Sequence, residues 1–437
     1  MSARLLVAGG TVVDPVAGTV GPADVRIDDG RIAAVGPSGA LGEDARVLDA
    51  RGLLVLPGLI DAHVHLREPG YEYKETIATG VRAALAGGFT AVACMANTNP
   101  VNDSGAVTQF ILDRAAAAGG ARVHPIGAVS VGLAGEQLAE FGEMQRAGIV
   151  AVSDDGVPVM DAGLMRRALE YARLFDLPVV VHEEDRHLAA GGVMHEGLVS
   201  LRLGLRGVPA AAEEVMVARD LALAELTGGR LHVAHVSTAG SVALIRAARA
   251  RGVRVTAEAT PHHLFLTDEA VAGYDTNAKM APPLRPRSDV DALRAAVADG
   301  TIEVIATDHA PHHRDEKDVE FEAAANGVIG LETALPLGLR LVAEGVLDLP
   351  TLAARLTVGP ARVLGLPGGT LAPGAPGDLT LVDPERRWRV DPRELRSRSR
   401  NTPFAGWEMT GRAVVVLVGG RVVHEEERPL AALRSAS

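Results

Sequence analysis

Eight short apolar segments alternate with Ala/Leu/Arg-rich segments through the middle of this 437-residue chain. The apolar segments read LIDAHVHL, FTAVACMANT, VHPIGAVSV, IVAVSDDG, PVVVHEED, LHVAHVS, VRVTAEATPHH and IEVIATDHAPH, and they end in polar residues. The segments between them, such as ETIATGVRAALAGG and GSVALIRAARARG, have helical periodicity and end in glycine. Eight strands that alternate with helices predict an α/β fold, a (β/α)8 TIM-type barrel, which we place at residues 57–365.

The two ends of the chain depart from this alternation and resemble each other. LLVAGGTVVDP near the start and VVVLVGGRVVHEE near the finish each have an apolar run, a Gly-Gly pair and two valines. Both patterns are typical of a strand, a glycine turn and a second strand. We therefore expect residues 1–56 and 366–437 to form one small β-sandwich domain beside the barrel.

The composition excludes several classes of protein. A net charge of −12 argues against nucleic acid and anionic membranes as partners. The single cysteine, Cys94, rules out an intramolecular disulfide, fits a reducing compartment and reads as a small core residue. No apolar run is long enough to cross a bilayer, and the N-terminus lacks the pattern of a signal peptide. We expect a cytoplasmic protein.

Residue types that bind metals gather where the predicted strands end. Asp61, His63 and His65 share one face of the first strand, because alternate residues of a strand point the same way. Four later strands end in further candidates, namely Asp155 (in Asp154-Asp155-Gly156), His182, His235 and Asp308. Barrels of this type have their active sites at the C-terminal ends of the strands, so these side chains should converge there.

The repetition of these residues favours a catalytic metal centre. One HxH pair among 14 histidines would be weak support, but ligands on five strand ends are strong support. A set of this size suits two divalent metals, with Zn2+ as the first choice, and exceeds the four closed ligands of a structural site. His232 falls on the opposite face from His235, and we interpret it as an ordinary histidine. Supporting roles are open to the histidines nearer the mouth, which are His262, His263, His309 and His313.

Nine motifs also occur in a characteristic order along the whole chain. They are DAHVHLREPGYEYKETIATG, MANTNP, SDDG, VHEED, VAHVST, ATPHHL, ATDHAPH, GLETALPL and SRSRNTPFAGW. In these motifs the chain resembles the class I bacterial dihydroorotases of the amidohydrolase superfamily. The resemblance implies a metal-dependent enzyme that reversibly closes N-carbamoyl-L-aspartate to L-dihydroorotate and water in pyrimidine biosynthesis.

The resemblance also implies a role for each matching residue. One metal would be bound by His63, His65 and Asp308, the other by His182 and His235, with Asp155 bridging them. Asp308 would in addition be the general acid and base. The substrate would be contacted by His65, Arg67, Asn97, His312 and the lid residues Asn326 and Gly327.

Two positions depart from the family's pattern. The family usually reads KMNPPLR, with the asparagine on the substrate, where this chain has KMAPPLR and therefore Ala281. Asn277, four residues earlier, is the candidate to replace that contact. The family's lid commonly carries FG before VGLET, whereas Asn326 and Gly327 stand here before VIGLET. Both departures concern substrate affinity and leave the metal ligands intact.

Two alternative functions remain. A related cyclic amidase (dihydropyrimidinase, hydantoinase or allantoinase) usually bridges its metals with a carboxylated lysine after strand four, where this chain has Asp155. The chain has three lysines, none of them near that strand: Lys74, Lys279 and Lys317. A non-catalytic dihydroorotase-like scaffold for aspartate transcarbamoylase should lack some ligands, and this chain lacks none. An active chain could still bind that transcarbamoylase or form a homo-oligomer.

Overall fold

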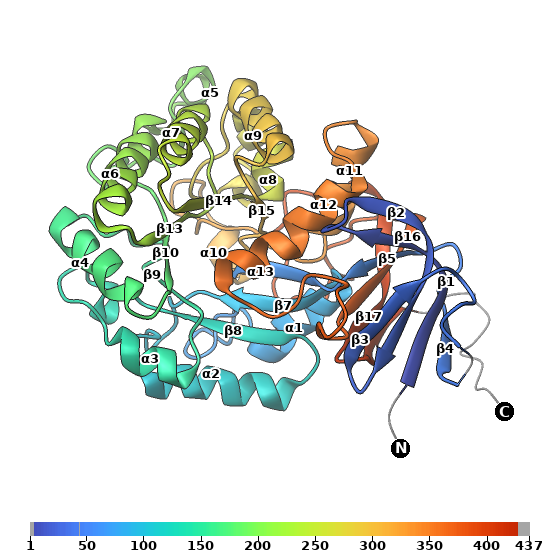
Figure 1. Cartoon of the computed structure of the whole chain (residues 1–437). Helices are drawn as coiled ribbons and strands as arrows, with labels where there is room; N and C mark the ends of the chain where they lie inside the picture. The colour runs from blue at the N-terminus through green and yellow to red at the C-terminus, as the bar shows by residue number, and fades with distance from the viewer. Residues whose placement is uncertain (1–3, 43, 427–437) are drawn as a thin grey trace.

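In the computed structural model of the protein, which describes residues 4–42 and 44–426, a barrel lies beside a separate β-sheet (Figure 1). Eight parallel strands form the barrel in the order β15-β14-β13-β10-β9-β8-β7-β6. Their bounds are β6 (Leu59–Val64), β7 (Phe89–Cys94), β8 (Arg122–Gly127), β9 (Ala151–Ser153), β10 (Pro178–Val181), β13 (Arg230–Val233), β14 (Val255–Ala259) and β15 (Val304–Ile305). A parallel bridge between Val64 and His309 joins the two ends of this series. The predicted barrel of eight strands is confirmed.

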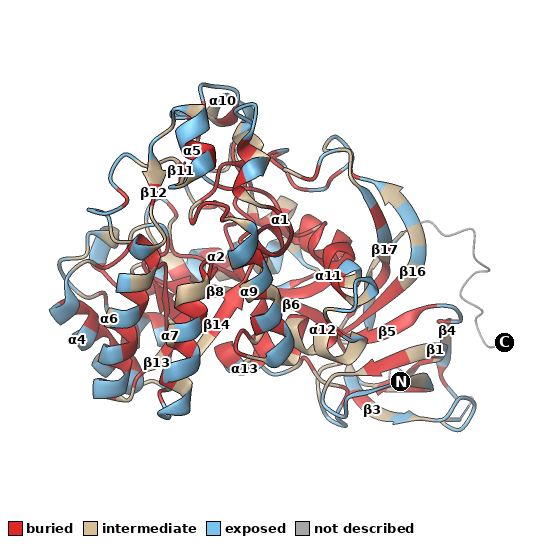
Figure 2. Ribbon diagram, turned by 90° about the horizontal axis from the view of Figure 1, so that it is seen from above, coloured by how far each residue is buried: buried red, intermediate tan, exposed pale blue. Residues whose placement is uncertain are grey.

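Helices cover the outside of the barrel, with buried inner faces and exposed outer faces (Figure 2). They are α1 (Ile77–Ala86), α2 (Gly105–Ala118), α3 (Phe141–Ala147), α4 (Ala162–Arg173), α6 (Ala211–Thr227), α7 (Ala239–Ala250), α9 (Arg287–Asp299), α11 (Ala334–Ala343), α12 (Leu349–Leu356) and α13 (Val358–Leu364). Side chains of Thr76, Asp161 and Thr238 cap α1, α4 and α7 by accepting a free backbone N–H group of the first turn. None of the described helices combines the length and apolar composition that crossing a bilayer requires.

Short elements occupy the connections between these strands and helices. They are η1 (Val131–Leu133), β11 (Met194–His195), α5 (Leu198–Leu203), β12 (Gly207–Val208), α8 (Pro261–Phe265), η2 (Asp268–Val271), η3 (Thr276–Ala278) and α10 (Arg314–Lys317). Most of them follow the C-terminal ends of barrel strands, where loops build the mouth of such a barrel.

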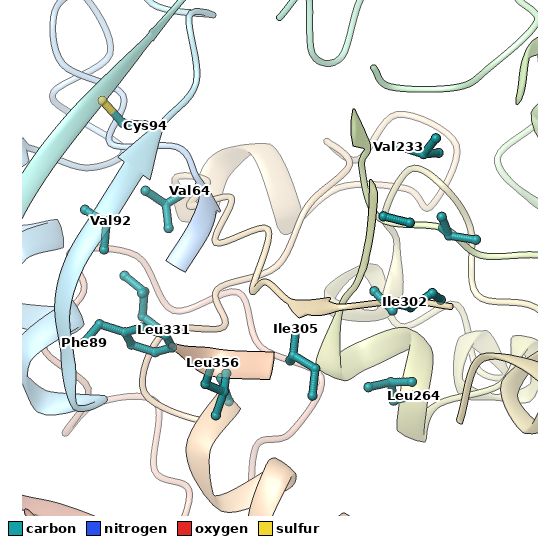
Figure 3. Close-up of a cluster of buried hydrophobic side chains, with 14 of the residues drawn as sticks. Val64, Phe89, Val92, Cys94, Val233, Leu264, Ile302, Ile305, Leu331 and Leu356 are labelled. Carbon is teal, nitrogen blue, oxygen red and sulfur yellow. The ribbon is translucent and has the colours of Figure 1, made fainter. Parts of the chain in front are cut away.

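Successive residues of the barrel strands alternate between two apolar layers. Val64, Val92 and Val233 belong to the layer between strands and helices (Figure 3). Cys94 is buried in the same layer, as predicted. The alternate positions form a separate cluster inside the barrel, which includes Ala93, Ile126, Val180 and Val304. The barrel interior is therefore packed with side chains and is not a pore.

Strands from both ends of the chain share the second eight-stranded sheet. Its strands are β1 (Arg4–Asp14), β2 (Thr19–Asp28), β3 (Arg31–Gly36), β4 (Arg46–Asp49), β5 (Leu54–Pro57), β16 (Leu379–Arg389), β17 (Glu408–Val418) and β18 (Arg421–Glu425). β5 pairs antiparallel with β16, and Ile27 and Ile32 pack in one cluster with Leu379 and Leu417. A β-sandwich domain formed from both ends is thus confirmed. The boundaries at 56/57 and 365/366 stay predictions, and residues 1–3, 43 and 427–437 of the predicted ranges lie outside the described residues.

Candidate metal centre at the barrel mouth

Six side chains from five strand ends meet at the C-terminal mouth of the barrel. They are His63 on β6 and His65 just after it, Asp155 after β9, His182 after β10, His235 after β13 and Asp308 after β15. All six are buried. The structure therefore brings together every residue that the sequence analysis proposed as a metal ligand.

The carboxylate of Asp155 lies among four imidazoles. Its oxygens are 3.5 Å from His63 Nε2, 3.4 Å from His65 Nε2, 3.6 Å from His182 Nδ1 and 3.4 Å from His235 Nε2. The last two nitrogens lie 2.8 Å from each other. One carboxylate thus connects two pairs of histidines, His63 with His65 and His182 with His235, which lie more than 100 residues apart in the sequence.

Asp308 completes the group around β6. Its Oδ1 lies 3.1 Å from His65 Nε2 and 3.5 Å from His63 Nε2. Burial raises the pKa of Asp308, but the imidazoles of His63 and His65 outweigh that effect and lower it below the usual range. Asp308 is therefore ionised at neutral pH and able to accept a proton.

The donor atoms fit a divalent metal. Two groups, His63-His65-Asp155 and Asp155-His182-His235, each offer ligand atoms within 4.8 Å of one another. Ligand atoms at about 2.0–2.1 Å from a tetrahedral zinc ion are about 3.3 Å apart, close to the separations measured for Asp155 and Asp308. His63 Nε2 and Asp155 Oδ1 are buried without a hydrogen-bond partner among the described residues. Buried polar atoms are seldom left so, and one cation would satisfy both.

The electrostatics also favour a bound cation. Burial lowers the pKa of His63, but Asp155, Glu258 and Asp308 raise it to well above its usual value. Burial conversely raises the pKa of Asp155, but His63, together with hydrogen bonds from His182 and His235, lowers it to well below its usual value. The carboxylates thus favour positive charge on the His63 imidazole. A metal would displace that proton, so metal affinity should increase as the pH rises.

Neighbouring groups fix the orientation of the ligands. His63 Nδ1 lies 2.6 Å from Glu258 Oε1, and His65 Nδ1 lies 2.9 Å from Asn97 Oδ1. Asp154, the residue beside the shared carboxylate, accepts two backbone N–H groups of the loop after β8 at 2.7 and 3.0 Å. Each imidazole of the first group is therefore held through one nitrogen while the other nitrogen faces the centre.

Three residues of the site have a left-handed backbone. The φ angles are 63° at Arg67, 30° at His235 and 45° at Asp308. Such angles cost about 1–3 kcal/mol each in residues other than glycine and are common at functional sites. Here they turn the chain sharply where a strand ends, which directs side chains into the mouth.

Arg67 lies beside the centre without an ion-pair partner among the described residues. Its Nε donates to the Pro311 carbonyl at 3.2 Å, and its Nη2 lies 3.3 Å from His312 Nε2. The other nitrogen of His312 lies 3.4 Å from Lys74 Nζ. Burial, followed by the charges of Arg67 and Lys74, lowers the pKa of His312 to about 3, so its imidazole is neutral. A partly buried guanidinium without a counter-charge favours a bound anion.

The other predicted substrate residues lie in different surroundings. Besides its bond to His65, Asn97 donates from Nδ2 to the Asp155 carbonyl at 3.4 Å. Asn326 is exposed, whereas Gly327 is buried. The Gly327 N–H donates to the Lys279 carbonyl at 3.0 Å, so that group already has a partner within the protein. Substrate contacts by Asn97, Asn326 and Gly327 stay predictions.

Ala281, one of the two positions that depart from the family's pattern, and Asn277, its candidate replacement, are both partly buried. Asn277 lines a cavity of about 470 Å³ together with His312, Lys317 and Asn401. Ala281 precedes Pro282, whose carbonyl is 3.0 Å from His263 Nε2. Asn277 therefore lies near one predicted anchor of the substrate, and its replacement of the missing asparagine stays a prediction.

Asn401, which the sequence analysis did not single out, ties three parts of the mouth together. Its Oδ1 accepts the His312 N–H at 3.1 Å, and its Nδ2 donates to the carbonyls of Ala310 and Gly327 at 3.0 Å each. Asn401 belongs to the connection between β16 and β17 of the second sheet. Its only signal in the sequence is its place in the motif SRSRNTPFAGW.

Comparisons with known proteins agree with this arrangement. The family described as dihydro-orotase-like matches residues 52–241, and the amidohydrolase family matches residues 208–424. Proteins named dihydroorotase from Anaeromyxobacter dehalogenans (strain 2CP-1) and Syntrophotalea carbinolica are each 60% identical to this chain, over 98% and 96% of it and 99% of their own lengths. Among solved structures, the L-hydantoinase (dihydropyrimidinase) of Arthrobacter aurescens has a TM-score of 0.87 at 26% identity, covering 99% of this chain and 98% of that one.

The shared position of Asp155 predicts an unequal loss of metal among ligand variants. We expect Asp155→Ala to lose divalent metal from both groups, and His182→Ala to lose it only from its own group, because Asp155 is the one proposed ligand that the two groups share. Metal content by mass spectrometry after zinc loading and dialysis would measure this. His124→Ala, at the start of β8, is the control. Equal metal content in Asp155→Ala and this control would contradict the prediction.

Proposed function

The chain belongs to the dihydroorotase family, and from this premise we propose that its barrel mouth closes N-carbamoyl-L-aspartate to L-dihydroorotate with loss of water and reopens the ring in reverse. The observation that carries the proposal is the Arg67 guanidinium, which lies beside the metal-binding residues without a carboxylate partner among the described residues. Hydrolysis of a neutral ring needs only the metal centre. A ring that bears a carboxylate needs an anchor of opposite charge as well.

We propose that each chain binds two divalent metals, with Zn2+ as the first choice. The residues that would hold them are His63, His65 and Asp308 for one, His182 and His235 for the other, and Asp155 for both. A divalent cation in such a site acts as a Lewis acid on a carbonyl oxygen and makes water a better nucleophile at neutral pH. The surrounding residues then have to bind the substrate and move protons.

Asp308 is the proposed proton carrier. In ring opening it accepts a proton from the attacking water and delivers it to the ring nitrogen that leaves. Ring closure converts a dianion into a monoanion and water, so the site must take up one proton. We assign that proton to Asp308, which must hold it when closure begins. Its lowered pKa therefore suits opening at neutral pH and makes closure depend on a minor, protonated form.

Arg67 and His312 are proposed to hold the substrate's carboxylate. The planar guanidinium can donate two parallel N–H bonds to a carboxylate. His312 is neutral, so one of its nitrogens can donate without adding a proton to the site. Asn401 holds the His312 backbone and Arg67 binds the Pro311 carbonyl, so both groups are fixed before the substrate arrives. Such preorganisation lowers the entropy cost of binding.

A related cyclic amidase is the less favoured function. Relatives 60% identical over nearly the whole chain are named dihydroorotase, whereas the hydantoinase is similar at 26% identity. Asp155 also stands where a carboxylated lysine is usual in those amidases. A non-catalytic scaffold is not favoured either, because all six ligand positions are occupied by suitable residues.

Partners and location remain proposals. We propose a homo-oligomer or a complex with aspartate transcarbamoylase, in the cytoplasm. The support is an apolar surface on α5, where Leu198 and Leu201 are 79% and 78% exposed. Large exposed apolar side chains that lie together are typical of protein interfaces.

The direct test is turnover of L-dihydroorotate, dihydrouracil and hydantoin by the purified protein, with and without a chelator. We expect only L-dihydroorotate to be opened, and chelation to abolish the activity until zinc is restored. Activity on the neutral rings alone would instead assign the protein to the dihydropyrimidinases. Failure on all three, also after addition of aspartate transcarbamoylase, would leave an inert scaffold.

Arg67→Lys should weaken substrate binding without changing metal content. Lysine keeps the charge but loses the paired donors, which are worth about 1.5–3 kcal/mol, so KM should rise roughly 10- to 150-fold. Steady-state kinetics in both directions would measure it. Arg314→Lys is a matched control, because Arg314 is exposed and already paired with Asp318 at 3.2 Å. An unchanged KM in Arg67→Lys would remove Arg67 from the substrate site.

The two directions should depend on pH in opposite ways. Opening needs ionised Asp308, whose lowered pKa keeps it ionised at neutral pH, so opening should lose rate only in acid, whereas closure needs the protonated form and should become slower as the pH rises. Initial rates at saturating substrate between acidic and alkaline pH would show this. Asp308→Asn should lower both rates roughly 10²–10⁴-fold. Parallel profiles in the two directions would show that Asp308 does not carry this proton.

A further inference from the structure

We propose that Glu258 is a positioning residue that fixes the orientation and the protonated nitrogen of the ligand His63, and that His232 and Thr256 hold Glu258 in place. The proposal rests on the metal centre of the proposed function but is independent of the substrate. It assigns a role to a buried polar chain inside the barrel that the reaction itself does not use.

Glu258 contacts both groups of metal-binding residues. It is completely buried, and its Oε1 lies 2.6 Å from His63 Nδ1. The same oxygen accepts the backbone N–H of His235 at 3.4 Å. One carboxylate oxygen thus holds the ring of a ligand in the first group and the backbone of a ligand in the second.

A chain of hydrogen bonds continues from Glu258 into the barrel. Its Oε2 lies 3.1 Å from His232 Nε2, and His232 Nδ1 lies 2.8 Å from Thr256 Oγ1. The strand register explains this geometry. His232 on β13 stands opposite Thr256 on β14, and Glu258 follows two residues later on the same face.

These hydrogen-bonded polar residues stand where the interior of the barrel is otherwise packed with apolar side chains. Interior positions on other strands of the barrel hold Ala93, Ile126 and Val180. An unpaired buried carboxylate would cost several kcal/mol, and even a paired one seldom adds stability over apolar residues. A role beyond stability is therefore needed to explain a glutamate here.

With both imidazoles neutral, as metal binding requires of His63, the donors and acceptors can be ordered in only one consistent way. A carboxylate accepts hydrogen bonds only, so Glu258 takes the N–H of His63 Nδ1 and the N–H of His232 Nε2. That leaves His63 Nε2 as a lone pair facing Asp155. It also leaves His232 Nδ1 as an acceptor for the Thr256 hydroxyl, whose other acceptor, the Leu231 carbonyl, is farther away at 3.4 Å.

The charge on Glu258 also makes His63 a stronger ligand than a neutral partner would. An imidazole that donates to a carboxylate is a more basic ligand through its other nitrogen. His65 has the neutral Asn97 in the equivalent place. The two histidines of one HxH pair are therefore supported differently, and His63 is the better metal ligand.

The test compares Glu258→Gln with Glu75→Gln. Glu75 is as deeply buried, but its histidine partner is His309, 3.5 Å away, which is not a proposed ligand. Competition with a chromophoric chelator would measure Zn2+ affinity. We expect Glu258→Gln to bind Zn2+ roughly 10- to 100-fold more weakly and Glu75→Gln to keep wild-type affinity. The visible spectrum of the Co2+-loaded protein should change only in Glu258→Gln.

A merely structural role would lower the melting temperature of the metal-free protein and leave Zn2+ affinity and the Co2+ spectrum unchanged, and that result would overturn the proposal. If Glu258→Gln does not fold, the Zn2+ affinity of Thr256→Val tests the proposal instead. It keeps the carboxylate but removes the hydroxyl that fixes His232, so a smaller loss of Zn2+ affinity is expected and none would refute the role. Loss of affinity without any opening of L-dihydroorotate by the wild type would uphold this inference and refute the proposed function.

Discussion

The burial of the Asp155 carboxylate among four imidazoles is the constraint on which the barrel mouth depends. Ionised groups removed from water are costly unless they are paired closely and hydrogen-bonded. The protein meets that requirement from all sides, because Asp155 lies 3.4–3.6 Å from nitrogens of four histidines. A cluster of this kind has a natural occupant in a divalent cation, which replaces the proton that the carboxylates stabilise on the His63 imidazole. The loops after the strands have to keep these groups in place whether or not the cation is bound.

The second sheet contributes to the mouth as well as to the outer surface. Between β16 and β17, the chain passes the barrel, and the backbone N–H of Arg398 donates to Glu75 at 3.1 Å. Three residues later Asn401 holds the backbone at His312 and Gly327. The second sheet therefore helps to fix the positions of the predicted substrate residues His312 and Gly327, so both domains contribute to the site.

The sequence predicts the barrel and its centre better than it predicts the contacts around them. Period-two spacing and the rule for strand ends suffice for His63, His65 and Asp308, because these depend on local pattern and on one property of the fold. They do not suffice for His232. His232 points to a different face of its strand from His235, as predicted. That face lies in the barrel interior, where His232 contacts the carboxylate of Glu258. Only the register between strands reveals such a pair.

Local sequence pattern cannot predict the contacts of Asn401 and Gly327, because these contacts join segments that are far apart in the chain. The segment from residue 321 to residue 327 shows the same limit. Lys317 Nζ donates to the carbonyls of Ala325 and Gly327 at 2.7 and 3.2 Å, and Lys279 Nζ donates to those of Phe321 and Glu322 at 2.7 and 2.8 Å.

An ammonium group has three N–H donors and can donate to several carbonyls at once. Two of the three lysines of the chain thus bind the backbone of residues 321–327. That segment includes Asn326, one of the two positions at which this chain differs from its family.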